Sequence, residues 1–328
     1  MTIVETPLAA PVGPVAEPFF TNEEVERLKT PVSFADFTAH HERALAYMRW
    51  RRQEAVEKDD RLAPSAEMAS DARLFRFLMA TGFVASEAAT MYIDALRWRA
   101  ERKVDALRDE LVAANPGFFG GSTRTLQKPL LGAIDCAMVQ SRPRTFFREA
   151  ADGTAELLLD REGNLVYIEV PAAVDPMGVA TIGDPQYTQA ELRMQELLQL
   201  IIDELSQRSG RLVFIFRIID LLGMSLTQNP FRSSVIKQGE VMVKAVGKEV
   251  KDSYPSTTFK NFIINAPAGD LAKPVINAMM PARSRDKTVI EGGKYRAALH
   301  SFVEPSQLPQ KLGGVLDDGV QWEKKKNK

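Results

Sequence analysis

The 328-residue chain contains one cysteine, Cys136, and only three histidines. A single thiol cannot form an internal disulfide bond, and it cannot build a zinc site of the kind that needs several cysteines. The chain therefore fits a reducing compartment, and we expect the cytoplasm. His40 and His41 are neighbours in a charged helical stretch, and His300 has no acidic residue at a useful spacing. We therefore expect no metal site.

The chain also lacks a long hydrophobic run and an excess of charge of one sign. No apolar stretch reaches the ~18 residues needed to cross a bilayer, and the longest, at about 212–224, is interrupted by Arg217 and Asp220. The 42 basic and 43 acidic residues give a formal net charge of −1, whereas nucleic-acid binding favours a basic excess. The N-terminus resembles neither a secretory signal nor a transit peptide. We expect no nucleic-acid partner and only transient, peripheral contact with membranes.

Sequence motifs of the common enzyme classes are missing too. There is no phosphate-binding loop, no G-x-G-x-x-G and no G-x-S-x-G elbow. The glycine pairs at 120–121 and 313–314 are turn material, and the Asp–Pro pairs at Asp175 and Asp184 are typical of turns. We therefore expect no enzymatic activity, no catalytic residues and no cofactor.

The residues that are present divide the chain into a helical part and a strand-containing part. Residues 1–20 are rich in Pro, Ala and Val without a period, which predicts a disordered tail. Over 21–112, apolar residues recur at helical spacing, as in 71–80, and Gly82 fits the end of that helix. The sequence predicts an all-helical N-terminal lobe over 21–112.

From residue 154 onward, apolar strands alternate with helices. A hairpin is predicted from 155–159 and 165–170, with Gly163 at its bend. The strands and helices that follow are expected at 188–207, 211–220, 229–251, 259–265, 269–280 and 287–290. This order predicts an α/β lobe over 113–316, with a mostly parallel sheet and flanking helices. The basic tail, 317–328, is either simply solvated or adds attraction to an anionic membrane surface.

Four segments in this order carry a resemblance to a known family. They are Leu74-Phe-Arg-Phe-Leu through Arg97-Trp-Arg; Asp160-Arg-Glu-Gly-Asn-Leu-Val-Tyr; Ile218-Ile-Asp-Leu-Leu-Gly; and Tyr254-Pro with Phe262-Ile-Ile-Asn-Ala-Pro and Leu308-Pro-Gln-Lys-Leu-Gly-Gly. Together they resemble the CRAL-TRIO lipid-binding family, of the phosphatidylinositol/phosphatidylcholine-transfer type. The resemblance implies a sheet that floors a closed apolar pocket, with a mobile helix over its mouth.

The resemblance also implies which residues contact a lipid. Tyr167 matches a pocket tyrosine, Lys287 a lysine that contacts the inositol phosphate, and Ser284 a nearby threonine; Lys287 could equally be a solvated turn lysine. Strand alternation places Ile215, Arg217 and Ile219 on one face, which the resemblance turns toward the pocket. The expected lipid-binding residues are Tyr167, Ile215, Arg217, Ile219, Asn261, Ile263, Ser284, Lys287 and Ile290.

Several head-group positions depart from the family pattern. The family's basic pair falls on Thr81 and Gly82, the glutamate after Tyr-Pro is Ser256, and two small hydroxyl residues of the choline site are Ile215 and Arg217. A buried guanidinium must be paired. Arg217 therefore either forms an internal salt bridge with a nearby carboxylate or pairs bidentately with a phosphate or carboxylate of the ligand.

The helix expected at 269–280 is the candidate lid. Its apolar stripe is either ordinary core or the face that opens at a membrane, and it comprises Leu271, Val275, Ile276, Met279 and Met280. The function favoured by these features is that of a monomeric lipid carrier, which holds one phospholipid or other lipophile and transfers it between membranes. The alternative is a regulatory module that senses lipid or binds a protein partner without bulk transfer.

Overall fold

The computed structural model describes residues 34–121, 123, 125–126, 144–150, 153–224, 233–250, 252–267, 273–279 and 282–317. The predicted disordered tail at 1–20, Cys136, and residues 318–328 of the basic tail lie outside the described residues. The chain forms two compact units. Unit 1 comprises Met1–Asp109, Glu196–Leu212 and Glu249–Thr257, and unit 2 comprises Glu110–Gln195, Val213–Lys248 and Thr258–Lys328.

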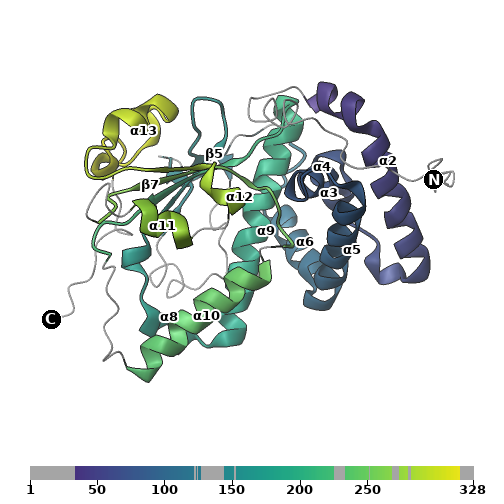
Figure 1. The fold of residues 1–328 in the computed structure, drawn as a ribbon, viewed down its shortest axis with the longest axis horizontal. Helices are drawn as coiled ribbons and strands as arrows, with labels where there is room; N and C mark the ends of the chain where they lie inside the picture. The colour runs from purple at the N-terminus through teal and green to yellow at the C-terminus, as the bar shows by residue number, and fades with distance from the viewer. Residues whose placement is uncertain are drawn as a thin grey trace. The chain divides into compact units, whose positions relative to one another are not determined.

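Unit 1 is helical, as the sequence predicts for this part of the chain. Its N-terminal helices are α2 (Phe34–Lys58), α3 (Ala66–Ala69), α4 (Asp71–Ala80) and α5 (Ala85–Arg102), followed by α6 (Val104–Ala114), which continues into unit 2. The hydroxyl of Ser70 caps α4 by accepting a hydrogen bond from the backbone N–H of Arg73 (3.2 Å). Gly82, with φ +61°, takes the chain out of this helix, which confirms the predicted stop. Helices α2, α4 and α5 pack together around a buried core (Figure 1).

Unit 2 is built on a five-stranded sheet in the order β2-β5-β6-β7-β8. Strands β5 (Leu165–Glu169), β6 (Ile215–Asp220), β7 (Thr258–Ile264) and β8 (Thr288–Ile290) are parallel, and β2 (Arg144–Thr145) is antiparallel to β5. The helices that follow these strands are α8 (Pro176–Ile182), α9 (Asp184–Ser209), α10 (Ser234–Val250), α11 (Lys273–Met279), α12 (Ala282–Arg285) and α13 (Arg296–Phe302). The prediction of an α/β fold with a mostly parallel sheet is confirmed.

The predicted hairpin at 155–170 is present beside its bend, where Leu159 pairs antiparallel with Leu165 and the N–H of Val166 donates to the carbonyl of Leu158 at 2.8 Å. Farther from the bend, its two strands belong to different sheets. Strand β4 (Ala155–Leu157) belongs to a separate small sheet with β1 (Thr125–Leu126) and β3 (Phe147–Glu149), whereas β5 joins the large sheet. The carboxylate of Asp160 accepts hydrogen bonds from the backbone N–H groups of Glu162 (3.0 Å) and Asn164 (2.7 Å). These bonds hold a tight turn with Gly163 at φ +77°, which confirms the predicted bend.

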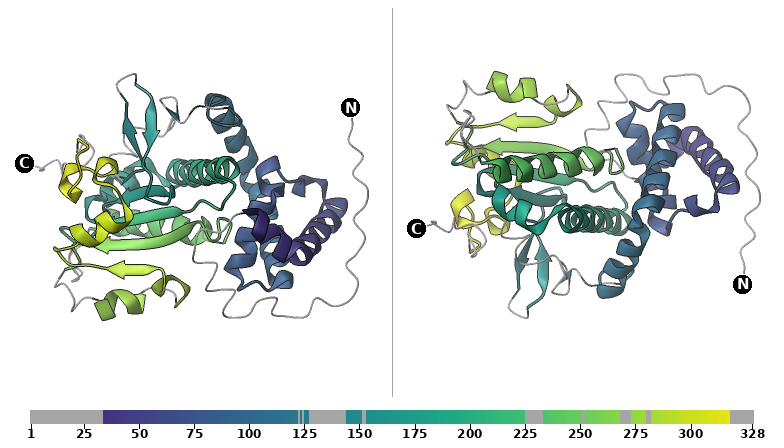
Figure 2. Two further views of the ribbon diagram at one scale, coloured as in Figure 1. Left: turned by 90° about the horizontal axis from the view of Figure 1, so that it is seen from above. Right: turned by 90° about the horizontal axis from the view of Figure 1, so that it is seen from below.

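The two faces of the large sheet differ. One face buries a continuous apolar cluster against α13 and the segment after it, and its strand residues are Val166, Ile168, Phe216, Ile218, Phe262 and Ile264. Helix α13 lies on this side, and α10 and α11 lie on the other (Figure 1 and Figure 2). The second face carries the strand residues that the sequence predicts for lipid binding. We call it the polar-row face, because a row of polar side chains crosses it.

Candidate functional site

A row of polar side chains crosses the middle of the sheet. Tyr167 of β5 pairs with Arg217 of β6, Arg217 with Asn261 of β7, and Asn261 with Thr288 of β8. Directly paired residues of parallel strands point to the same face, so these four side chains form one line. We call Tyr167, Arg217, Asn261 and Thr288 the polar row.

Apolar side chains lie on both sides of the polar row. Toward the carboxyl ends of the strands, Ile219, Ile263 and Ile290 pair across the sheet, and toward the amino ends Ile215 pairs with Leu165. Three of these isoleucines are buried: Ile215, Ile263 and Ile290 have exposed fractions of 5–7%. The strand positions predicted for lipid contact thus share one face, because the two-residue period of a strand is fixed by its geometry.

One irregularity in β7 is needed for this arrangement. Ile215 pairs with Thr258, whereas the next residue of β6, Phe216, pairs with Lys260, so β7 contains one extra residue at Phe259. A bulge of one residue reverses the face to which all later side chains point. Because of it, Asn261 and Ile263 lie beside Arg217 and Ile219 instead of on the α13 face.

Arg217 forms an ion pair with Glu169 on this face. The guanidinium Nε donates to Glu169 Oε2 at 2.9 Å, and Nη2 donates to the same oxygen. The side chain of Glu169 is 10% exposed and that of Arg217 is 36% exposed. The internal salt bridge considered for Arg217 is therefore present, and its contact with a ligand stays a prediction. Sequence reasoning missed Glu169, although its place two residues after Tyr167 on the same strand was a usable signal.

Ser284 and Lys287 lie at the amino end of β8, next to the polar row. The hydroxyl of Thr288 donates to the backbone carbonyl of Ser284 at 2.6 Å, and Asn261 Nδ2 donates to Thr288 Oγ1 at 3.4 Å. The carbonyl of Lys287 accepts from the backbone N–H of Asn261 at 2.8 Å, and the Lys287 side chain is half-buried. A lipid contact of Ser284 and of Lys287 stays a prediction.

The candidate lid corresponds to α11, which begins at Lys273. Ile276 packs on the apolar row toward the carboxyl ends of the strands, against the cluster of Ile263, Ala266 and Ile290. Leu271 and Met280 lie outside the described residues, as do the side chains of Val275 and Met279. One lid residue is therefore located on the polar-row face, and opening of the helix stays a prediction.

Thr81 and Ser256, at two of the altered head-group positions, have structural contacts of their own within unit 1. The hydroxyl of Thr81 donates to the carbonyls of the last turn of α4, including that of Phe77 at 3.2 Å. The carbonyl of Ser256 accepts a hydrogen bond from Nη1 of the buried Arg76 at 3.2 Å. Thr81 and Ser256 thus form hydrogen bonds within unit 1 at positions where the family has charged groups.

None of the helices in the described ranges is long and apolar enough to cross a membrane. In the same part of the chain, no three His, Cys, Asp or Glu side chains come together in a way that could hold a metal ion. His41 instead stacks on Phe75 in the core of unit 1, with 5.4 Å between ring centroids.

Residues 158–314 match the sequence model of the CRAL/TRIO domain.

The curated proteins that match this chain share a low sequence identity with it. Phosphatidylinositol/phosphatidylcholine transfer protein SFH9 of Arabidopsis thaliana is 24% identical over 250 residues, which cover 74% of this chain and 36% of SFH9. Sec14 cytosolic factor of Schizosaccharomyces pombe is 26% identical over 252 residues, which cover 76% of each protein. Patellin-4 of Arabidopsis thaliana is 25% identical over 279 residues, which cover 81% of this chain and 43% of Patellin-4. The chain thus spans less than half of SFH9 and of Patellin-4.

Among solved structures, the crystal structure of Sfh5 is similar to this chain with a TM-score of 0.45 and 16% sequence identity. The match covers 92% of this chain and 90% of Sfh5.

Proposed function

We propose that this chain is a non-enzymatic carrier that binds one phospholipid on the polar-row face of its CRAL/TRIO domain and transfers it between membranes. The observation that carries the proposal is the arrangement of that face, where a polar row containing Arg217 is flanked by apolar rows. An amphiphile needs both kinds of surface. SFH9 is named a phosphatidylinositol/phosphatidylcholine transfer protein, and this name supports a phospholipid as the ligand.

The two kinds of surface would take the two ends of the lipid. Isoleucines at 215, 219, 263 and 290 offer aliphatic contacts to an acyl chain, which gains roughly 25 cal/mol for each Å² removed from water. Arg217 keeps about a third of its side chain exposed beside Glu169, and a guanidinium binds phosphate well because its donors form a planar fork. We therefore propose that the phosphate of the lipid lies at Arg217.

The remaining parts of the proposal concern the membrane. Helix α11 would act as the lid, because its residue Ile276 covers the apolar row that the acyl chain would occupy. Its displacement at a membrane surface would open the face for exchange. The carrier would act as a cytoplasmic monomer that contacts membranes only transiently.

Native mass spectrometry of the gently purified full chain, after incubation with phosphatidylinositol and phosphatidylcholine vesicles, tests the proposal. We expect one lipid per chain. Ile219→Trp, which places bulk on the polar-row face, should lower the occupied fraction severalfold, whereas Val241→Trp, at a 65% exposed position of α10, should leave it unchanged. Circular dichroism checks that both variants are folded. A wild-type chain that stays empty would overturn the proposal.

A further inference from the structure

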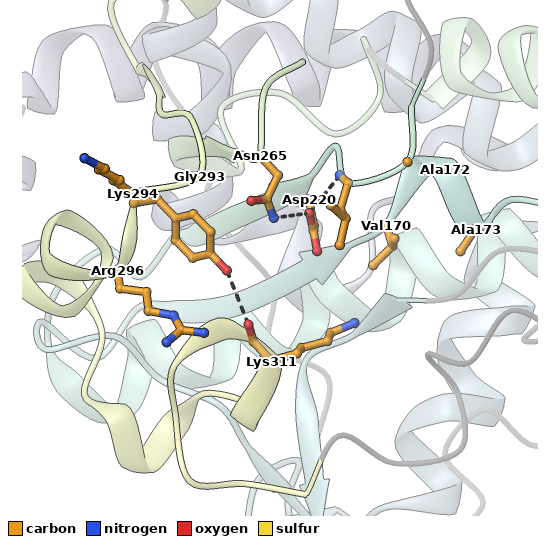
Figure 3. Close-up of a pocket in the computed structure, with 12 residues that line it drawn as sticks. Val170, Ala172, Ala173, Asp220, Asn265, Gly293, Lys294, Arg296 and Lys311 are labelled. Carbon is orange, nitrogen blue, oxygen red and sulfur yellow. Dashed lines mark hydrogen bonds between the residues drawn. The ribbon is translucent and has the colours of Figure 1, made fainter. Parts of the chain in front are cut away.

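A cavity of about 730 Å³ lies within unit 2, at the carboxyl ends of the parallel strands. Its lining includes the residues that directly follow β5 and β7, Val170 and Asn265, and the last residue of β6, Asp220 (Figure 3). Gly293 lies beyond the end of β8. The loops that follow the parallel strands therefore line this cavity.

This cavity is distinct from the polar-row face. Asp220 follows Ile219, and strand alternation turns it to the face that carries Phe216 and Ile218. Tyr295, which also lines the cavity, belongs to the apolar cluster of that face. The cavity thus lies on the α13 side of the sheet, and an occupant there does not require one on the other side.

The charges around the cavity favour an anion. Among the described residues that line it, Lys294, Arg296 and Lys311 are basic and Asp220 is acidic. The carboxylate of Asp220 is already engaged, since Oδ1 accepts from the backbone N–H of Leu222 (2.9 Å) and from Asn265 Nδ2 (2.8 Å). In Figure 3 the Lys294 ammonium points away from Asp220 and Lys311, so we consider Arg296 and Lys311 as the cations of the cavity.

The side chain of Arg296 passes close to a glycine. Gly313 has φ +87°, and a Cβ atom there would lie 3.0 Å from Cδ and 3.2 Å from Nε of Arg296. The missing Cβ leaves room for the arginine to lie across the chain at this point. Gly313 belongs to the sequence Leu308-Pro-Gln-Lys-Leu-Gly-Gly, which also supplies Lys311. This segment therefore builds one wall of the cavity.

A second contact joins that wall to Tyr295. The Tyr295 hydroxyl donates a hydrogen bond to the backbone carbonyl of Lys311 at 3.3 Å (Figure 3). Burial raises the pKa of this hydroxyl, and the nearby Asp220 carboxylate raises it further, so the hydroxyl stays protonated at neutral pH. The two segments that bring Arg296 and Lys311 to the cavity are thus fixed to each other before any ligand binds.

We propose that this cavity binds a phosphate monoester, with the guanidinium of Arg296 and the ammonium of Lys311 as its cationic partners. Arginine offers two parallel N–H donors to phosphate oxygens, and lysine adds a compact positive charge. The phosphate ester could belong to a soluble molecule or to the head group of a membrane lipid. Both sources present the same group to the two side chains.

Titration calorimetry of the full chain with inorganic phosphate and with myo-inositol 1-phosphate tests the soluble source. Flotation with phosphatidylcholine vesicles, with and without phosphatidylinositol 4-phosphate, tests the lipid source. The double variant Arg296→Gln/Lys311→Gln should weaken binding of the effective probe by at least about tenfold, because each lost charge-assisted hydrogen bond contributes a factor of that order. Arg296→Lys keeps the positive charge but loses the two parallel N–H donors. Its affinity for the probe should therefore lie between that of the wild type and that of the double variant.

The matched control is Lys237→Gln/Lys244→Gln, which removes the same charge from two exposed positions of α10. The affinity of this control variant for the probe should lie within about twofold of that of the wild type, because exposed charges contribute little to binding. Binding of a soluble probe, or of the phosphoinositide vesicles alone, supports the proposal and identifies the source. If no probe binds, or if the control loses as much binding as the cavity variant while both remain folded, the proposal is overturned.

Discussion

Arg217 and Glu169 form an ion pair on the sheet face that we assign to the lipid. Strand alternation predicted that Arg217 shares a face with Ile215 and Ile219, because the side-chain period of a strand is fixed. The partner of Arg217 could not be predicted in the same way, since pairing β5 with β6 depends on the register of the folded sheet. A substitution of Arg217 alone would leave the buried Glu169 carboxylate without its partner, which destabilises a protein whatever the ligand.

A neutral double variant avoids that difficulty. In Glu169→Gln/Arg217→Leu both charges of the pair are removed together. We expect this variant to lose its preference for anionic over zwitterionic phospholipid by about tenfold, since a charge-assisted contact of about 1.4 kcal/mol disappears. Mass spectrometry of the lipids bound after incubation with mixed vesicles measures the preference, and Glu169→Gln alone, which keeps Arg217, is the control. If the double variant binds the same mixture of lipids as the wild type, Arg217 forms only its internal ion pair with Glu169 and does not contact the lipid.

Glu196 in unit 1 offers a prediction on pH. It is 1% exposed, and its Oε2 accepts hydrogen bonds from Arg99 Nη1 and from the hydroxyl of Tyr254, both at 2.8 Å. Burial acts to raise the pKa of Glu196, but the attraction of Arg99 outweighs it and holds the pKa below the ordinary value of 4.5. A carboxylate with a lowered pKa stabilises the fold above its ordinary pKa, and this contribution is lost as the pH falls.

Glu196→Gln should therefore lower the free energy of unfolding by about 3 kcal/mol at neutral pH, because it leaves a buried guanidinium short of charge. The difference from the wild type should shrink as the pH falls below 4.5. Denaturant unfolding followed by tryptophan fluorescence measures both quantities. Tyr254→Phe, which removes one hydrogen bond to the carboxylate, should cost less, about 2 kcal/mol. A difference between Glu196→Gln and wild type that is independent of pH would contradict this account.

At the scale of elements, α10 contains two glycines with opposite surroundings. Gly239 is buried where α10 meets α8, and a Cβ atom there would lie 1.9 Å from the carbonyl oxygen of Pro176. Gly247 is exposed, and nothing lies within 4 Å of the position that its Cβ would take. Glycine in a helix is about 1 kcal/mol less favourable than alanine, so helix propensity alone would make both replacements stabilising.

We expect the two alanine variants to differ in sign. Gly247→Ala should raise the free energy of unfolding by up to about 1 kcal/mol, whereas Gly239→Ala should lower it by about 1–3 kcal/mol because α8 and α10 must move apart. Thermal unfolding of the two variants under identical conditions measures both. Equal shifts in the same direction would show that the close approach of α10 to Pro176 is not present in solution.

Periodic elements were predicted well, and elements that depend on side-chain contacts were not. The helix at 71–80 has the predicted bounds, because apolar residues at helical spacing mark one buried side. The strand expected at 211–220 begins only at Ile215. Before it, the backbone N–H of Phe214 donates to the side chain of Asn164 at 3.1 Å instead of entering a ladder. An apolar run alone does not reveal such a bond.

At the scale of the whole molecule, the sequence predicted the α/β class and the family but not the division of the chain into units. Residues 196–212 and 249–257 belong to unit 1, although they lie within the stretch predicted as the second lobe. Buried contacts between distant residues hold them there, such as the hydrogen bond from Arg73 Nε to Asp203 at 3.1 Å. Arg73 and Asp203 are 130 positions apart, and no local pattern connects them. The boundaries at 112 and 113 stay a prediction.

Carriage of a phospholipid is the central claim, and transfer between vesicles tests it most directly. Donor vesicles contain a fluorescent phosphatidylinositol or phosphatidylcholine with a quencher, and acceptor vesicles contain neither. The account predicts that the purified chain, in amounts far below those of the lipid, raises the transfer rate in proportion to its concentration, and that Ile219→Trp abolishes the increase while Val241→Trp does not. A chain that binds phospholipid but leaves the transfer rate at its spontaneous value would contradict the account.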